Sequence, residues 1–300
     1  MNRSRFAAFV MLMLPFPLSG CFFLSTTRKL PVPIAPPIIQ TVAPEELVNG
    51  LDQRWAALDT LNATVEIQAS VIHPKEGVAK DYSRFRGHIL MRKPEFLRVF
   101  VQVPVLGTPA LDMATDGKTF TLYSHLQNKA FKGPNTVTKR STNTLENLRP
   151  GFFFDAMMVR GLEKADQYYV TADTDTVEDV AKKHLLLEPE YILSIVRAKG
   201  DTQELTPVRV VRFHRDDLLP CQQDIYDDKG NLETQVFYSQ YAEFGSVKGA
   251  GKYPSSVIIK RPLDGIQIVL TVDNVVENMK LPDDQFAIQI PADTPVQKLE

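Results

Sequence analysis

The sequence predicts an α+β fold in which a curved antiparallel sheet carries a few helices on one side. One helical pattern near the N-terminal end is followed by many segments in which apolar and polar residues alternate. Tight turns such as Asp116-Gly117-Lys118 join several of these segments, and strands joined by tight turns pair antiparallel. Because no internal repeat divides the series, we expect one domain over residues 44–300.

The N-terminal segment has the pattern of a bacterial lipoprotein signal. A basic head, residues 1–5, precedes an apolar run that ends at Leu18-Ser19-Gly20-Cys21. A basic head, an apolar run and small residues are typical of a secretory signal peptide. The cysteine that follows the small pair predicts a signal over residues 1–20 and lipid attachment at Cys21. An ordinary signal peptide or a short membrane helix is the alternative, but the run is shorter than the ~20 residues that span a bilayer.

The expected lipid anchor predicts where the protein resides. We expect a periplasm-facing protein that is lipid-anchored in the outer membrane, because Phe22 stands where an aspartate holds many lipoproteins at the inner membrane. Residues 21–43 would form the lipidated N-terminus and a tether. The tether is rich in proline from Leu30 to Pro37, which favours an extended, semi-rigid spacer.

The elements of the domain follow in order. A helix is expected from Pro44 to about Asp59, with Leu47, Leu51 and Trp55 on its apolar face. Two short helices, over 141–148 and 152–159, interrupt the strands. Strands are expected over 63–71, 85–91, 97–103, 110–114, 119–123, 168–172, 184–187, 191–199, 208–214, 222–226, 236–241, 256–260 and 266–276.

Charge and cysteine content exclude several classes of protein. The chain has 34 Lys and Arg against 36 Asp and Glu, so there is no basic surplus for nucleic acid. If Cys21 is acylated, Cys221 has no partner for a disulfide within the chain. We therefore expect Cys221 to be a buried, inert thiol rather than a nucleophile.

Motifs of enzymes and metal sites are absent from the sequence. The five histidines are scattered, with no His-Glu-x-x-His, and there is no Gly-x-Ser-x-Gly elbow or phosphate loop. The pairs Asp173 with Asp175 and Asp216 with Asp217 fit solvated turns better than a calcium loop. We expect no enzymatic activity, no cofactor and no metal.

Several motifs carry a family resemblance. Arg92-Lys93-Pro94-Glu95-Phe96-Leu97-Arg98, and Asp116-Gly117-Lys118-Thr119 with the strand after it, resemble the core of the LolA/LolB superfamily of lipoprotein carriers. Cys21 favours the LolB branch, since LolA is soluble. Pro104-Val105-Leu106-Gly107 is similar to the Pro-Leu-Gly loop of LolB, with Val105 as an extra residue. Tyr253–Ile259 and Gly265–Leu270 resemble its closing strands.

The resemblance implies an incomplete, half β-barrel with a helical lid and an apolar cavity for acyl chains. Its function would be to accept acyl chains of lipids or lipoproteins, with a soluble LolA-like protein as the donor, and to help insert lipoproteins into the outer membrane. We expect a monomer. Apolar residues of the strands and of the expected lid are the cavity candidates: Trp55, Val65, Ile67, Ile89, Met91, Val99, Val101, Leu111, Met113, Phe120, Leu122, Phe153, Ile266, Ile268 and Leu270.

Two alternatives stay open at this point. Val105 and Leu106 stand between prolines, so they either protrude and contact the membrane or fold back on the core. The segment Leu187–Phe213 is longer than the family's sheet needs, and the tail from Leu281 to Ile288 looks more like that of LolA. The chain could thus be an anchored envelope protein that senses or binds partners on the same fold, without transport activity.

Overall fold

The computed structural model describes residues 32–73, 77–135, 149–179, 183–200, 202–244 and 251–299. The expected signal, Cys21 and the expected helix over 141–148 lie outside these residues. Pro33–Glu300 form one compact unit, which is the part described below. No helix among the described residues is both long enough and apolar enough to cross a membrane.

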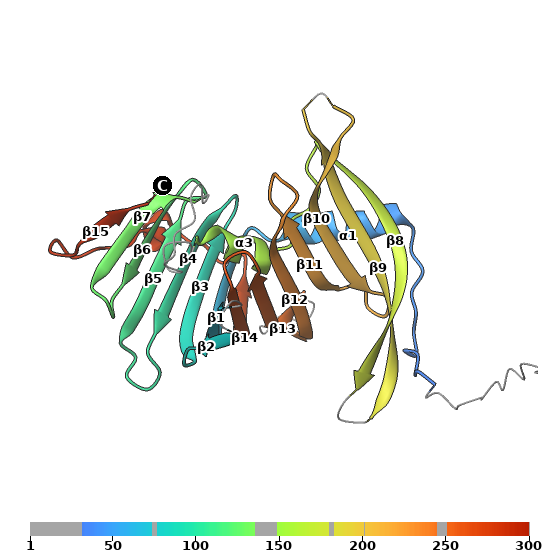
Figure 1. Ribbon diagram of the computed structural model, residues 1–300, viewed down its shortest axis with the longest axis horizontal. Helices are drawn as coiled ribbons and strands as arrows, with labels where there is room; N and C mark the ends of the chain where they lie inside the picture. Colours follow the sequence, from blue (N-terminus) through green and yellow to red (C-terminus); the bar gives the residue numbers. More distant parts are fainter. Residues whose placement is uncertain are drawn as a thin grey trace, which may run out of the picture. The chain divides into compact units, whose positions relative to one another are not determined.

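One large sheet of 15 strands dominates this unit, and it is open rather than closed into a barrel (Figure 1). The order of strands is β15-β7-β6-β5-β4-β3-β1-β14-β13-β12-β11-β10-β9-β8, with β2 beside β1. All pairs are antiparallel except β15 with β7. The strands are β1 (Thr60–His73), β2 (Val78–Asp81), β3 (Phe85–Arg92), β4 (Phe96–Gln102), β5 (Pro109–Thr115), β6 (Thr119–Ser124), β7 (Lys129–Pro134), β8 (Asp166–Asp179), β9 (His184–Ala198), β10 (Leu205–His214), β11 (Pro220–Tyr226), β12 (Leu232–Glu243), β13 (Lys252–Arg261), β14 (Ile266–Glu277) and β15 (Val296–Lys298).

Strand β1 joins the early and late parts of the chain. It pairs with β3 on one side and with β14 on the other, so that Val65 lies opposite Gly87 and Val272. The alternation predicted for this segment is confirmed, because Ala63, Val65 and Ile67 are buried while the residues between them are more exposed. The predicted curved antiparallel sheet is thus confirmed.

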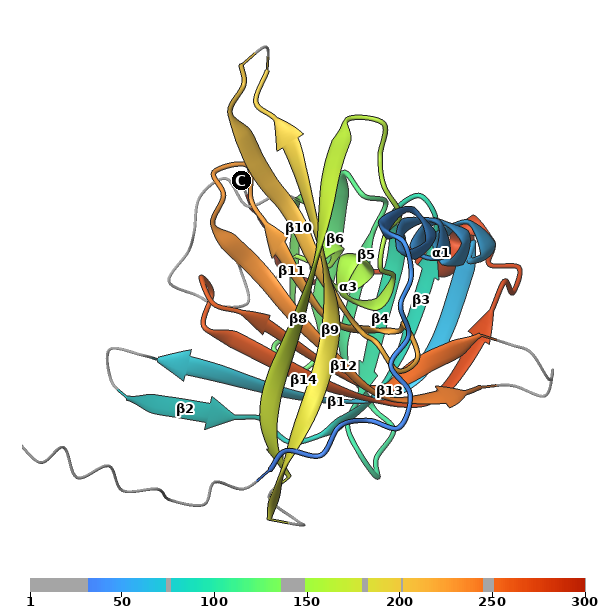
Figure 2. The ribbon, with the colours of Figure 1, turned by 90° about the vertical axis from the view of Figure 1, so that its right-hand side faces the viewer.

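Two hydrophobic cores lie on this sheet, each built around one helix. Helix α1 (Pro44–Ala57) buries Leu47, Val48 and Leu51 against residues of β9 and β10, such as Leu193 and Val211. Helix α3 (Gly151–Met157) packs into the larger core formed by the other strands. Figure 2 shows α3 in the hollow of the curved sheet.

Helix α3 is part of the core, and the expected helical lid is not confirmed. Five of its seven residues are buried, among them Phe153 and Phe154. The edge of Trp55 on α1 meets the Phe154 ring, with 6.4 Å between the ring centroids. This burial places α3 within the core, and the other expected lid helix lies outside the described residues.

The end of the proline-rich tether is attached to the sheet. The Ile34 N–H donates to the carbonyl of Leu185, and the Leu187 N–H donates to the carbonyl of Ile34, each across 2.8 Å. Further along, the Gln40 N–H donates to the carbonyl of Arg215 at 2.6 Å. These bonds join the end of the tether to strand β9 beyond the end of β10, within the compact unit Pro33–Glu300.

Some elements differ from the prediction. The strands expected over 184–187 and 191–199 are one strand, β9, and β2, β7 and β15 were not predicted. Strand β9 continues through Pro189. The Pro189 carbonyl accepts from the Arg215 N–H, so the backbone of this proline faces a position just beyond the end of β10. The missing N–H of the proline therefore lies where no strand requires a donor.

Candidate functional site: an apolar pocket and its rim

The larger core contains an apolar pocket of about 290 Å³, which we call the apolar pocket. Strands β1, β3, β4, β5 and β14 supply most of its walls, and α3 contributes Phe153. Its lining residues are Ile67, Ala69, Val71, Tyr82, Phe85, Val99, Val101, Ala110, Leu111, Met113, Ser124, Leu126, Gln127, Phe153, Ile266 and Ile268.

The register of the strands explains why the pocket has a rim at one end of the sheet. Val71 pairs with Ile266, where β1 ends and β14 begins. Leu111 pairs with Ser124, near the start of β5 and the end of β6. The strand ends that line the pocket therefore lie at the same end of the sheet. The pocket lies close to the turns that connect those strands.

A glycine allows close packing beside the pocket. Gly87 lies opposite Val65 and Val101 in the sheet. A Cβ added at Gly87 would come within 2.7 Å of the Ile67 Cδ1 atom. Because a real Cβ does not approach another carbon so closely, the Ile67 side chain can take this position only over a glycine.

The structure places eight of the fifteen cavity candidates on the apolar pocket: Ile67, Val99, Val101, Leu111, Met113, Phe153, Ile266 and Ile268. Six others are buried in the same core but do not line the pocket, because neighbouring side chains pack directly against them: Val65, Ile89, Met91, Phe120, Leu122 and Leu270. The sequence cannot separate the two groups, since both alternate in the same way along their strands.

Trp55 lies at a different cavity. It lines a larger and more polar pocket of about 610 Å³ between α1 and the ends of β12 and β13, together with Tyr241 and Tyr253. The Lys93 ammonium lies 4.1 Å from the centroid of the Trp55 ring, and its Nζ also donates to the Trp55 carbonyl. The ring is held by these contacts and by Phe154, which keeps it away from the apolar pocket.

Several lining residues were missed by the sequence reasoning. Ala69 and Val71 continue the alternation of Val65 and Ile67, so the pattern could have included them. Tyr82, Leu126 and Gln127 belong to connections between strands, where periodicity gives no direction for a side chain. Their place at the pocket depends on the path of the connections, which no local pattern encodes.

The loop between β4 and β5 protrudes into solvent. Val105 is 105% exposed and Leu106 is 74% exposed, so the loop does not fold back on the core. The Val103 N–H donates to the Thr108 carbonyl at 2.9 Å, which closes the base of the loop. Val105 has a φ of 68°, a conformation that is costly for a β-branched residue.

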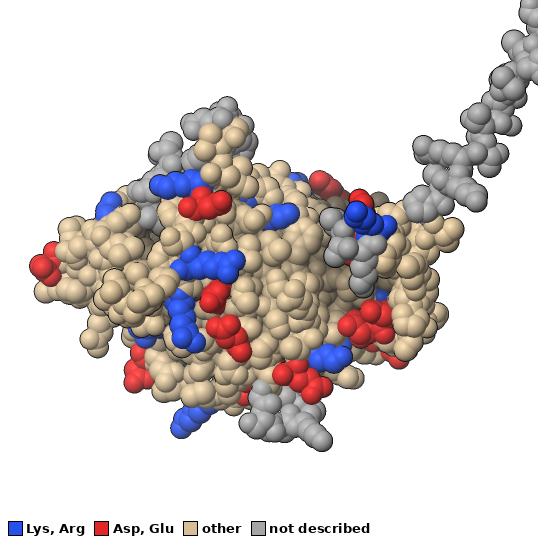
Figure 3. All heavy atoms as spheres, turned by 90° about the horizontal axis from the view of Figure 1, so that it is seen from below, with Lys and Arg blue, Asp and Glu red and all other residues tan. Residues whose placement is uncertain are grey.

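Other exposed apolar side chains lie at the same end of the sheet as this loop. They come from the end of β1, the β2 region, and the β4–β5, β6–β7 and β13–β14 connections. We call them the lower rim: Ile72, Val78, Tyr82, Val105, Leu106, Leu126 and Leu263. Figure 3 views the molecule from below, where the charged side chains are scattered and broad areas between them carry no charge. Exposed apolar side chains also occur elsewhere on the described surface, such as Tyr169 and Leu205, so the lower rim is distinguished by its place beside the apolar pocket and not by its number of residues.

No protein-family model and no curated protein matches the sequence. Solved structures do show similarity. A LolA superfamily protein from Nitrosomonas europaea aligns over 83% of this chain and 99% of its own, with 15% identity and a TM-score of 0.47. A DUF1329 family protein from Desulfovibrio piger aligns over 81% of this chain and 95% of its own, with 15% identity and a TM-score of 0.48.

A third structure is a domain named for outer membrane lipoprotein sorting, from Vibrio parahaemolyticus. It aligns over 80% of this chain and 94% of its own, with 10% identity and a TM-score of 0.47. Two of the three names agree with the LolA/LolB resemblance of the sequence motifs, while nothing in them is specific to LolB. With TM-scores below 0.5, these likenesses carry no argument for a shared site or activity.

Proposed function

We propose that this protein is a membrane-anchored carrier that accepts an acyl chain of a lipid or lipoprotein in the apolar pocket. In this role it helps to insert lipoproteins into the outer membrane, and it binds its cargo rather than converting it. The observation that carries the proposal is a pocket with a mostly apolar lining beside a rim of exposed apolar side chains.

The size and chemistry of the pocket suit part of an acyl chain. Apolar cavities of about 150 Å³ remain dry and take up benzene. The apolar pocket is larger, at about 290 Å³, and its walls are mainly aliphatic. Each methylene that leaves water contributes about 0.8 kcal/mol, so a few buried methylenes would hold a chain without a charged contact.

The lower rim supports the delivery step of this proposal. An acyl chain released from the pocket must not cross water, because its exposure would cost the same free energy that its burial contributed. A rim that contacts the bilayer beside the pocket would let the chain pass from one apolar environment to another. Transfer of this kind is nearly isoenergetic, so it needs no nucleotide.

The anchor and its partners complete the proposal. Lipid chains on Cys21 would hold the protein at the outer membrane on its periplasmic side, and residues 21–32 would connect them to the domain. Stable anchoring requires more than one acyl chain, which a lipoprotein anchor would supply. A soluble LolA-like protein is the proposed donor of the cargo.

The test is acyl binding by the Pro33–Glu300 unit, which has its own hydrophobic cores. We expect a fluorescent fatty acid to bind at one site and to be displaced by an acylated peptide. Ala69→Phe fills the apolar pocket and should abolish binding. Ala79→Phe is the matched control on exposed β2 and should leave it unchanged. Equal binding by both variants would contradict the proposal.

Strand β8 supports the alternative, an anchored envelope protein that binds or senses a partner. Within the described part of the chain this strand of 14 residues pairs only with β9, and nearly all of its residues are exposed. A free strand edge can pair with a strand of another protein. Absence of acyl binding, together with retained folding, would favour this alternative over the carrier.

A further inference from the structure

Three neighbouring strands bring a carboxylate, an imidazole and a thiol together outside the apolar pocket. Glu190 belongs to β9, His214 is the last residue of β10, and Cys221 is near the start of β11. One ligand atom of each lies within 4.8 Å of the other two. The Cys221 Sγ lies 3.2 Å from the Glu190 Oε1, and the His214 Nδ1 lies 3.8 Å from the same oxygen.

The sheet itself builds this cluster. Glu190 and His214 are directly opposite each other in the β9–β10 pair. A β-bulge then shifts the β10–β11 register, so that Phe213 pairs with Pro220 and Arg212 pairs with Gln222. Cys221 is the extra residue of this bulge. Bulges re-aim side chains and are frequent beside functional sites, and this one turns Cys221 toward the other two groups.

We infer that Glu190, His214 and Cys221 form a binding site for a zinc ion. Thiolate, imidazole and carboxylate are the ligands that zinc takes in proteins. Three protein ligands leave a fourth position for water, which is the pattern of an open rather than a closed zinc site. When zinc binds, the Cys221 thiol loses its proton to solvent and the sulfur forms the bond to the metal.

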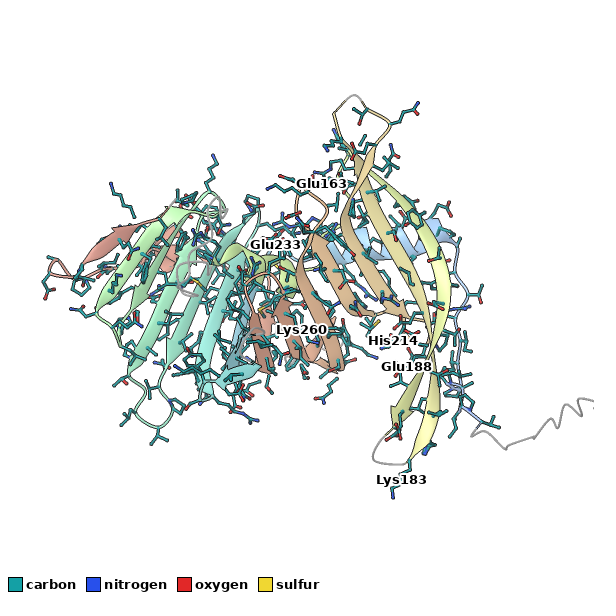
Figure 4. All side chains as sticks on the ribbon, in the orientation of Figure 1. Glu163, Lys183, Glu188, His214, Glu233 and Lys260 are labelled. Atoms are coloured by element: carbon teal, nitrogen blue, oxygen red, sulfur yellow. The ribbon has the colours of Figure 1, made fainter. Side chains whose placement is uncertain are left out.

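The surroundings of the cluster suit this role. The Arg212 Nη1 donates to the Glu190 Oε2 at 3.1 Å, which fixes the carboxylate and leaves Oε1 facing the sulfur and the imidazole. Outer hydrogen bonds of this kind orient the ligands of metal sites. Glu190 and Cys221 are buried, whereas the His214 side chain is 37% exposed and gives the ion a route of entry. Figure 4 shows His214 at the lower end of β10.

A simple hydrogen-bonded thiol is the competing explanation. Without a metal, burial and the neighbouring Glu190 raise the pKa of Cys221, so that the thiol is protonated and donates to the carboxylate. This arrangement would need only Cys221 and Glu190. It does not require His214, whose Nδ1 lies 3.8 Å from the same oxygen, beyond hydrogen-bond distance. The convergence of a third ligand type within 4.8 Å of the other two is the feature that points to a metal.

The experiment is a cobalt titration of the full chain, purified in detergent and freed of metal with a chelator. Cobalt(II) is the probe, because a cobalt–thiolate bond gives a charge-transfer band in the near ultraviolet and zinc leaves no such signal. We expect one equivalent of cobalt to produce the band and zinc to abolish it. Cys221→Ser should remove the band, and His214→Ala should weaken cobalt binding at least tenfold.

His125→Ala is the control, since His125 lies in the β6–β7 connection and should have no effect. If Cys221→Ser fails to fold, His214→Ala decides the question, because its partly exposed side chain can be removed without unfolding the sheet. The inference is overturned if the unaltered chain gives no band. It is also overturned if the band survives in Cys221→Ser, which would mark binding elsewhere, or if His214→Ala binds cobalt as tightly as the unaltered chain.

Discussion

The Tyr253 hydroxyl donates a hydrogen bond to the Met157 carbonyl across 2.8 Å and so joins strand β13 to the last turn of α3. The Tyr238 hydroxyl binds the Ala156 carbonyl in the same way, also at 2.8 Å. The Gln223 side chain donates to the carbonyl of Asp155. The carbonyls at the end of a helix have no partners within it, so these side chains satisfy them and fix α3, whose Phe153 lines the apolar pocket.

Removing one of these hydroxyls should destabilise the fold. Tyr253→Phe leaves the buried Met157 carbonyl without a partner, which costs about 1–3 kcal/mol. The ring remains, so the loss reports the hydrogen bond and not the packing. Urea unfolding followed by circular dichroism measures the change. Tyr169→Phe, on exposed β8, is the control, and an equal effect in both variants would show that the bond to α3 contributes nothing.

Sequence patterns predicted the strands of the core well and the position of the pocket poorly. Val65 and Ile67 alternate with polar residues because one face of β1 is buried, and this pattern is local. Whether a buried side chain packs against another side chain or lines the pocket depends on the position of Phe153. Long-range hydrogen bonds from Tyr238 and Tyr253 hold the helix that carries Phe153.

Replacing an exposed apolar residue of the lower rim should weaken membrane contact without unfolding the protein. Leu106→Glu places a charge at the tip of the β4–β5 loop, where the side chain is 74% exposed. We expect stability to change by less than about 0.5 kcal/mol. Sedimentation of the Pro33–Glu300 unit with lipid vesicles should show at least a tenfold loss of binding, by analogy with about 1.5–3 kcal/mol for burying a leucine.

The matched control is Leu205→Glu, which changes another exposed leucine at the start of β10, outside the lower rim. Vesicle binding by this variant should equal that of the unaltered protein. If both variants lose binding equally, added negative charge rather than the rim would explain the result, and the rim would have no role.

The Asp116 turn should contribute stability that depends on pH. Its Oδ1 accepts from the Thr119 N–H at 2.7 Å and from the Lys118 N–H at 2.9 Å. The hydrogen bond from Thr119, followed by others in the turn, holds the pKa of Asp116 below its usual value. A depressed pKa means that this stability is fully present above the ordinary pKa of about 3.9 and is lost as the pH falls toward the folded value.

The measurement compares Asp116→Asn with the unaltered protein in urea. Asparagine can accept the same hydrogen bonds, so the difference isolates the charge. We expect Asp116→Asn to be less stable than the unaltered protein by no more than about 0.5 kcal/mol at near-neutral pH, because solvent screens this exposed turn. The difference should shrink as the pH falls below about 3.9. A difference that stays constant over this range would contradict the assignment of the charge to Asp116.

Cys21 should be the residue that holds the protein at the membrane. Cys21→Ser removes the sulfur that would carry the lipid, so we expect the chain to leave the membrane fraction and to lose the mass of the lipid. Cys221→Ser is the matched control, since the buried Cys221 should not be acylated, and the chain should remain membrane-bound. Retention of the Cys21→Ser chain at the membrane, with its mass unchanged, would exclude the anchor.

Other features depend on contacts that a sequence cannot reveal. Strand β2 was missed because all four of its residues are exposed, so it has no alternation, and only its pairing with β1 makes it a strand. Cys221 is close to His214 in the sequence while Glu190 is farther away, and only the register of β9, β10 and β11 places the three side chains together. The expected burial of Cys221, by contrast, is confirmed.

The central claim is that an acyl chain occupies the apolar pocket, and photocrosslinking tests it most directly. The Pro33–Glu300 unit would be mixed with a fatty acid that carries a diazirine near its methyl end, irradiated and digested, and the modified residues would be identified by mass spectrometry. We predict crosslinks to pocket residues such as Ile67, Val99 and Met113, and their loss in Ala69→Phe. Crosslinks confined to the cavity that Trp55 lines, or to the outer surface, would contradict the claim.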